Sequence, residues 1–216
     1  MIREFALIDL AYLLAATRWT LALAAIAALG GGLVGLTIAL LRVAPSAPLR
    51  WAAVGYIQAV QGTPLLAWLF LFFFGLPIMG VTVSPWIAAA VAYSVYAGAF
   101  LGEIWRGCLQ AIPRTQWEAG AALGLSFAEQ LRHVIAPQAV RIAIPPTVGF
   151  LVQLIKNTSL AAVIGFIELT REGQLTTAAT FRPFTVYLIV AMIYFALCFP
   201  LTQWSRHLER RLHVAR

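Results

Sequence analysis

Charged side chains inside long apolar runs are the residues of this chain that could do chemistry. Glu103 lies at the end of one run, and Lys156 lies well inside another. An ionisable group within a membrane-spanning helix costs at least about 2.5–3.5 kcal/mol, so it is a functional candidate there. Glu103 could form an i,i+3 ion pair with Arg106 or contact a solute. Lys156 could line a solute pathway, and Glu103 is one possible partner for its charge.

The polar residues that follow Lys156 leave the same two readings open. They could line the pathway, or they could hold helices together through hydrogen bonds. These residues are Asn157, Thr158 and Ser159.

Catalysis would need a nucleophile and a base at comparable depth. The apolar runs contain no histidine or aspartate, since His133, His207 and His213 lie in polar segments. The phosphate-binding pattern G-x-x-x-x-G-K-[S/T] is also absent from the sequence, because Lys156 is its only lysine. We therefore expect no catalytic residue, no metal site and no cofactor bound by this chain. An intramembrane enzyme and a secondary transporter remain the disfavoured alternatives, the latter because no inverted repeat is visible.

The composition places these residues in a bilayer. Hydrophobic residues make up 62% of the 216 residues and charged residues 11%. Soluble domains average roughly 45–50% apolar residues and about 25% charged residues. A span needs about 20 residues. The runs that qualify are Leu21–Leu41, Ala52–Phe74, Trp86–Leu101, Ile142–Ile167 and Phe184–Leu201. We predict an all-α membrane protein with about five transmembrane helices in a single domain, residues 1–216. Residues 1–20 of this domain are expected to form a segment on the outer surface.

The basic residues divide unequally between the two sides of these spans. Ten lie on one side and four on the other, the latter being Arg3, Arg18, Arg171 and Arg182. Positive charge favours the cytoplasmic side, so we expect a cytoplasmic C-terminus and an outward N-terminus. The net charge of +7 therefore reflects orientation and does not indicate nucleic-acid binding. The larger group is Arg42, Arg50, Arg106, Arg114, Arg132, Arg141, Arg206, Arg210, Arg211 and Arg216.

Residues 114–137 form a polar stretch on the predicted cytoplasmic side. Thr115 precedes Glu118 by three residues, and Ser126 precedes Glu129 by three, as in capping boxes. Gly124 suits a left-handed helix end, and we expect Pro137 to end the second helix. The pattern predicts a helix, a glycine bend and a second helix that together dock a partner.

This stretch resembles the EAA loop of ABC importer permeases. Glu118-Ala119-Gly120, then Gly124, then nine residues and Val134-Ile135-Ala136-Pro137 follow the family's pattern, with Gly120 in place of alanine. The segments at 61–65, 99–107 and 156–160 resemble those of the polar amino-acid and opine branch. Gln61-Gly62-Thr63-Pro64-Leu65, for example, has Gln61 where that branch has arginine.

The resemblance implies the membrane-spanning subunit of an ATP-driven importer for a polar amino acid, or for an opine or related solute. It implies a plasma-membrane complex of two permease subunits, identical or paralogous, two ATP-binding subunits and an extracytoplasmic solute-binding protein. ATP and Mg would lie on the ATP-binding partner. The implied coupling residues are Thr115, Trp117, Glu118, Ala119, Gly120, Gly124, Ser126 and Pro137. The pathway candidates are Gln61, Thr63, Glu103, Lys156, Asn157, Thr158 and Ser159.

Overall fold

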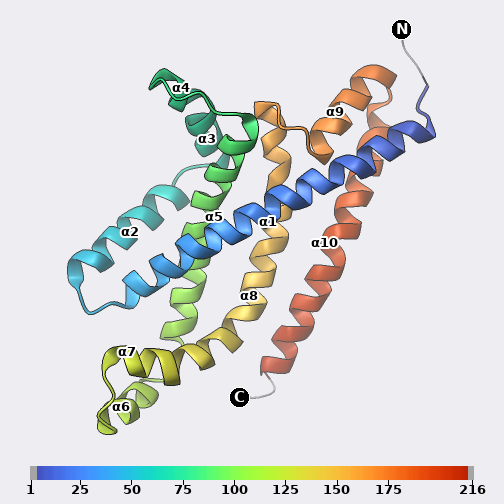
Figure 1. Cartoon of the computed structure of the whole chain (residues 1–216). Helices are drawn as coiled ribbons and strands as arrows, with labels where there is room; N and C mark the ends of the chain where they lie inside the picture. Colours follow the sequence, from blue (N-terminus) through green and yellow to red (C-terminus); the bar gives the residue numbers. More distant parts are fainter. Residues whose placement is uncertain (1–3, 214–216) are drawn as a thin grey trace.

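The computed structural model describes residues 4–213, with side chains to Arg210. Arg3 and Arg216, which enter the charge argument, lie outside that range, as does the side chain of Arg211. All regular secondary structure in the described residues is helical, with no strand (Figure 1). Four helices are long and apolar enough to span a membrane, and a bent helix pair raises the number to five.

The elements follow one another along the chain as successive helices and helical turns. In order they are α1 (Leu7–Val43), α2 (Ala47–Gln61), α3 (Leu65–Phe70), a wide π-helical turn (Leu71–Gly75), α4 (Leu76–Ile78), α5 (Pro85–Gln110), α6 (Arg114–Ala122), α7 (Phe127–Gln130), a second π-helical turn (Leu131–Ile135), α8 (Ala136–Asn157), a 3-10 turn (Thr158–Ile164), α9 (Leu169–Thr180) and α10 (Pro183–His213).

The first span is longer than the sequence predicted. α1 is one helix of 37 residues, about 55 Å long, and it crosses α5 and α8 obliquely in Figure 1. The separate surface segment expected over residues 1–20 is therefore wrong from Leu7 onward, because these residues form the first turns of α1. The helix also takes in Asp9, whose carboxylate is buried and accepts a hydrogen bond from the Ala6 N–H at 2.9 Å.

The second span is broken. The run Ala52–Phe74 was predicted as one helix, but α2 and the helix Leu65–Ile78 meet at 96°. The break falls at Gly62, Thr63 and Pro64, because the proline ring disfavours a helical conformation for the residue before it. The Thr63 hydroxyl donates to the Ala59 carbonyl at 2.9 Å, back along α2.

α5 is the centre of the bundle and packs against α1, α2, α3 and α8. Two glycines of α1, Gly31 and Gly35, allow the close approach of α1 and α5. A Cβ atom on Gly31 would lie 2.4 Å from the Cβ of Ala97, and one on Gly35 would lie 2.9 Å from that of Leu101. The fully buried Tyr93 fixes the other side of α5, since its hydroxyl donates to the Asn157 carbonyl of α8 at 2.5 Å.

The fourth span begins far from the apolar run that predicted it. A single helix of 38 residues runs from Phe127 to Ile164, so Pro137 does not end a helix. The π-helical turn Leu131–Ile135 stops two residues before Pro137, and the turn Leu71–Gly75 stops two residues before Pro77. A proline lacks the N–H of an α-helical bond and crowds the preceding turn, and a wider turn there lets the helix continue.

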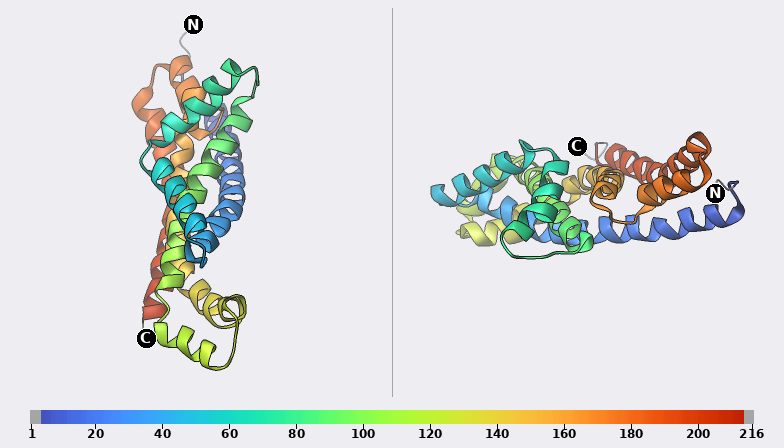
Figure 2. Two further views of the ribbon diagram at one scale, coloured as in Figure 1. Left: turned by 90° about the vertical axis from the view of Figure 1, so that its left-hand side faces the viewer. Right: turned by 90° about the horizontal axis from the view of Figure 1, so that it is seen from above.

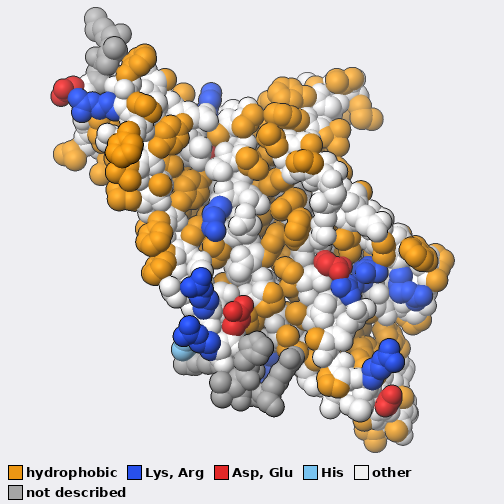
Figure 3. All heavy atoms as spheres, turned by 180° about the vertical axis from the view of Figure 1, so that it is seen from behind, with side chains coloured by type: hydrophobic (Ala, Val, Ile, Leu, Met, Phe, Trp, Pro, Cys, Tyr) orange, Lys and Arg blue, Asp and Glu red, His pale blue; other side chains and the backbone are white. Residues whose placement is uncertain are grey.

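The last span contacts the fourth at the middle of that long helix. The buried Ser205 hydroxyl of α10 donates to the carbonyl of Pro145 at 2.9 Å. Figure 2 shows α6 and α7 projecting beyond the bundle at the end where α10 finishes. On the face seen in Figure 3, most Lys and Arg side chains lie toward that end, and apolar side chains dominate the rest.

Candidate functional site: a projecting helical loop and a polar cleft

The first helix of the projecting loop begins at a proline. Pro113 is the N-cap residue of α6, and its φ of −53° leads directly into the helix without a side-chain cap. The capping box predicted between Thr115 and Glu118 is therefore wrong, because both residues lie within α6. Glu118 is exposed in the second turn of the helix. Its carboxylate is available to a partner.

The bend after α6 is the one predicted at Gly124. Its φ is +75°, in the left-handed region. The Gly124 N–H bonds the Ala121 carbonyl at 2.9 Å, and the Leu125 N–H bonds the Gly120 carbonyl at 3.1 Å. These two bonds make a Schellman motif, which satisfies the last carbonyls of α6.

The second helix of the loop begins with the predicted capping box at Ser126. The Ser126 hydroxyl accepts from the Glu129 N–H at 3.4 Å, and the Glu129 carboxylate accepts from the Ser126 N–H at 2.8 Å. The Ser126 hydroxyl also donates to that carboxylate at 2.6 Å. The start of α7 is fixed by these reciprocal bonds.

Two contacts hold α6 against the helix that follows it. The rings of Trp117 and Phe127 stack with centroids 5.7 Å apart. Gly120 is buried, and a Cβ atom there would lie 2.9 Å from the Cγ of Gln130, whose amide donates to the Leu125 carbonyl at 2.7 Å. Glycine therefore replaces the family's alanine where Gln130 crosses the loop. The loop is a rigid unit joined directly to the fourth span.

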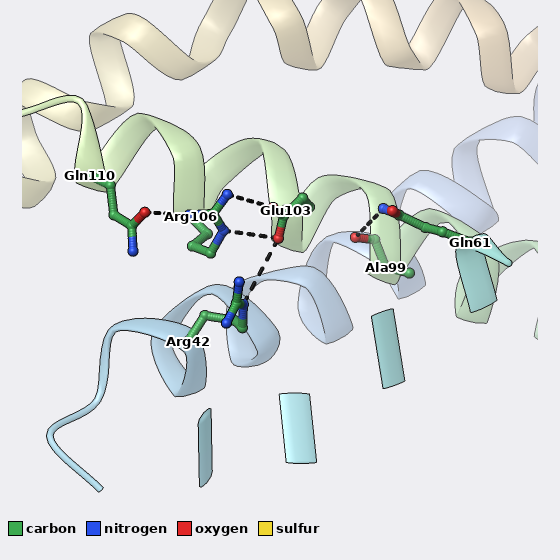
Figure 4. Close-up of polar contacts among 6 residues, drawn as sticks. All are labelled: Arg42, Gln61, Ala99, Glu103, Arg106 and Gln110. Atoms are coloured by element: carbon green, nitrogen blue, oxygen red, sulfur yellow. Dashed lines mark hydrogen bonds and ion pairs between the residues drawn. The ribbon is translucent and has the colours of Figure 1, made fainter. Parts of the chain in front are cut away.

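The structure places Glu103 in an ion-pair network. The Arg106 Nε and Nη2 donate to its two carboxylate oxygens at 2.9 and 2.5 Å (Figure 4). The Arg42 Nε lies 3.9 Å from the same carboxylate, and Arg106 also bonds the Gln110 side chain. The predicted i,i+3 pair is thus present, and Arg42 is an additional partner supplied by α1.

Glu103 lines a cleft of about 420 Å³ together with Gln61, Phe100 and Ile142. Gln61 occupies the position where the resembling segment has arginine, and its amide donates to the Ala99 carbonyl at 3.4 Å. The cleft therefore has polar groups from α2 and α5 on one side and apolar groups from α8 on the other.

The other pathway candidates lie outside this cleft. Lys156 is exposed on α8, and within the described part of the chain it forms no ion pair with Glu103. The Thr158 and Ser159 hydroxyls bond the carbonyls of Ile155 and Lys156 at 2.7 and 2.8 Å. Each of these hydroxyls thus bonds a carbonyl three residues earlier in its own chain segment. The Asn157 side chain accepts from the Gln153 amide at 3.0 Å.

One buried carboxylate, that of Glu168, was not identified from the sequence. Glu168 is fully buried at the start of α9, where its carboxylate accepts from the Arg171 N–H at 2.9 Å. It also accepts from the hydroxyls of Tyr194 on α10 at 2.8 Å and Thr20 on α1 at 3.3 Å. Burial raises the pKa of this carboxyl above its ordinary value. Glu168 thus joins three helices at the end of the bundle opposite the projecting loop.

The fold and the projecting loop define the class of protein: a multi-pass membrane component of a transport system, and not an enzyme. Residues 31–214 match the family described as the binding-protein-dependent transport system inner membrane component. The chain belongs to that family. Membership implies an ATP-binding subunit and a substrate-binding protein as partners, and a location in the inner membrane.

Individual relatives cover nearly the whole chain. The L-cystine transport system permease protein TcyB of Bacillus subtilis is 38% identical over 90% of this chain and 83% of its own length. The glutamine transport system permease protein GlnP of Escherichia coli strain K12 is 34% identical over 94% of this chain and 93% of its own. A solved amino acid ABC transporter, crystallised with histidines, superposes with a TM-score of 0.89 at 31% identity, covering 98% of this chain and 99% of that one.

Proposed function

We propose that this chain is the membrane-spanning subunit of an ABC importer that carries a polar amino acid. The names of its relatives support the class of solute, since they specify L-cystine and glutamine. The solved neighbour is itself an amino acid transporter. The mixed polar and apolar cleft beside Glu103 fits a small zwitterion better than a large or wholly apolar solute.

The projecting loop is the docking site for the ATP-binding subunit, which would hold ATP and Mg. The observation that carries this proposal is the continuity of the loop with the fourth span, which is one helix from Phe127 to Ile164. A displacement of α6 by the ATP-binding subunits would move that helix and change access to the cleft. Exposed Glu118 is the acidic contact that α6 offers.

The cleft beside Glu103 faces a second permease subunit, either a copy or a paralogue. Side chains from one subunit cover only part of it, and Glu103 remains one-third exposed. A second subunit opposite would close a pathway between the two clefts. Lys156 and its neighbours on α8 would then line the same pathway nearer its outer end.

The loop side of the bundle is cytoplasmic. The ten-to-four division of basic residues favours this orientation, which puts the start of the chain outside and its end inside. Single cysteines at Thr82 and Glu209, both exposed at opposite ends, would be labelled in intact cells with an impermeant reagent. We expect labelling at position 82 only, and labelling at position 209 alone would reverse the assignment.

Charge reversal at Glu118 tests the docking site. We expect Glu118→Lys to reduce co-purification of the ATP-binding subunit and to lower ATP-driven uptake, with normal membrane insertion. Glu209→Lys is the matched control, because Glu209 is exposed at the same end of the molecule but lies on α10. Equal uptake and equal association in both variants would contradict the docking assignment.

A further inference from the structure

An apolar groove lies between α1, α5 and α8, on a side of α5 different from the polar cleft. Its volume is about 670 Å³, and its lining shares only Cys108 with the cleft. Small residues make it deep, because Gly32 on α1 faces Ala139 and Ala143 on α8. A Cβ atom added to Gly32 would still be 3.9 Å from the Trp105 ring.

The groove offers almost no hydrogen bond to an occupant. The Trp105 indole N–H already donates to the Thr147 hydroxyl at 2.9 Å. The remaining lining is aliphatic apart from Cys108, and Leu33 and Leu36 at its edge are 73% and 51% exposed. A polar solute would gain nothing here, whereas a hydrocarbon chain would lose no hydrogen bond on entering.

A second hollow, of about 800 Å³, continues the groove toward the projecting loop. It is lined by Arg42 and Arg50 at the α1–α2 connection and by Arg114 at the start of α6. Glu118 also lines it, so its lining carries three positive charges and one negative charge. The Arg42 Nε also lies 3.9 Å from the Glu103 carboxylate, and Arg50 donates to the carbonyls of Ala44 and Pro45. Within the described residues Arg114 forms no ion pair, so its guanidinium is available to an anion.

Helical spacing shows that the two hollows are continuous along their shared walls. On α1 the stripe Leu36 and Leu40 of the groove continues to Val43 of the basic hollow. On α5 Leu109 lines both hollows. On the fourth span Leu131 of the groove lies one turn beyond Phe127 of the basic hollow.

We propose that this composite groove binds an anionic phospholipid. One acyl chain lies between α1 and α8, and the phosphate lies among Arg42, Arg50 and Arg114. Arginine forks match phosphate oxygens, and basic pockets between transmembrane helices on one side of a membrane bind lipid headgroups. The lipid enters from the leaflet on the loop side, which is the inner leaflet in the orientation proposed above.

The bound headgroup connects the bundle to the projecting loop. Arg42 and Arg50 belong to the α1–α2 connection, and Arg114 begins the loop helix that receives force from the ATP-binding subunit. A phosphate between them stabilises the loop against the bundle. Anionic lipid therefore increases the coupling of ATP hydrolysis to uptake, whichever amino acid is carried.

The test uses the whole transport complex in nanodiscs of phosphatidylcholine with or without phosphatidylglycerol. Native mass spectrometry measures the retained phosphatidylglycerol. Arg114→Gln should weaken retention about fivefold, since an interfacial arginine contributes about 1 kcal/mol toward anionic lipid. Arg141→Gln, at an exposed arginine outside both hollows, should retain lipid as the wild type does.

Filling the groove tests the acyl chain separately from the headgroup. Gly32→Leu should weaken retention about tenfold, because its side chain displaces about two buried methylene groups. Ala25→Leu, at an exposed position of α1 outside the groove, is the matched control. Phosphatidylglycerol should raise the ratio of uptake to ATP hydrolysis in the wild type and both controls, and should do so less in Arg114→Gln and Gly32→Leu.

Equal lipid retention in all variants would overturn the proposal. An effect reproduced by inorganic phosphate in pure phosphatidylcholine would overturn the acyl-chain part of it. A disulfide between permease copies through Leu36→Cys would also overturn it, because the groove would then be occupied by protein. Lipid retention is measured separately from association with the ATP-binding subunit, so a failure of this proposal can be distinguished from a failure of the docking assignment.

Discussion

Removing the Glu168 carboxylate should destabilise the end of the bundle where α1, α9 and α10 meet. Its carboxylate caps α9 through the Arg171 N–H and accepts from the Tyr194 and Thr20 hydroxyls. Loss of an N-cap costs about 1 kcal/mol, and each side-chain hydrogen bond contributes about 1 kcal/mol. Glu168→Ala should therefore lower the free energy of unfolding by about 3 kcal/mol.

Thermal unfolding of the purified complex, followed by tryptophan fluorescence, measures this cost. A change of 1 kcal/mol corresponds to about 2–4 °C for a chain of this size, so the transition should fall by roughly 6–12 °C. Glu172→Ala is the matched control, because Glu172 lies one turn later on α9 and is only half-buried. A shift for Glu168→Ala no larger than that for Glu172→Ala would refute the reasoning.

The pH dependence gives a second reading of the same site. Burial raises the pKa of Glu168, so the folded protein holds this proton more tightly than the unfolded chain does. The stability that the protonated group contributes is complete below the ordinary carboxyl pKa and decreases as pH rises through the raised pKa. The advantage of the wild type over Glu168→Gln should therefore be largest at acidic pH. An advantage that grows as pH rises would show that the site favours the ionised carboxylate.

Further substitutions test the loop, the cleft and Lys156. Gly124→Val should abolish coupled uptake, because a β-branched residue at a φ of +75° is strained by about 1–2 kcal/mol; normal uptake at normal expression would contradict this. Glu103→Gln should cost less than about 1 kcal/mol, because the pair with Arg106 is partly exposed and screened, and Arg106→Gln should add little further cost in its background; additive costs in a double-mutant cycle would argue against the pair. Lys156→Met should leave assembly intact, since Lys156 is exposed, and should change the dependence of uptake on solute concentration; unchanged dependence would remove Lys156 from the pathway.

Local sequence signals predicted those features that depend on neighbouring residues. Gly124 and Ser126 act through bonds within five residues, and both have the predicted geometry. Gly31 and Gly35 repeat at helical spacing, and both lie at the α1–α5 contact. Glu103 and Arg106 are three residues apart, and their pair was one of the two readings considered.

Competing local signals and distant contacts account for the rest. Thr115 matched a capping box, but Pro113 fixes the start of α6 two residues earlier. Pro137 matched a helix end, but a π-helical turn just before it carries the helix onward. Glu168 gave no pattern, because its partners Thr20 and Tyr194 are 148 and 26 residues away. No spacing rule could place these three side chains together.

The contact between Ser205 and Pro145 holds the fourth span at its middle. The helix from Phe127 to Ile164 has 38 residues and is about 57 Å long. Pro145 stands at its midpoint, where α10 holds it through the Ser205 hydroxyl. A movement of the loop end is therefore passed through this held point to the Lys156 end of the same continuous helix. The two sides of the membrane are thus linked by one element of the chain and not by contacts between separate helices.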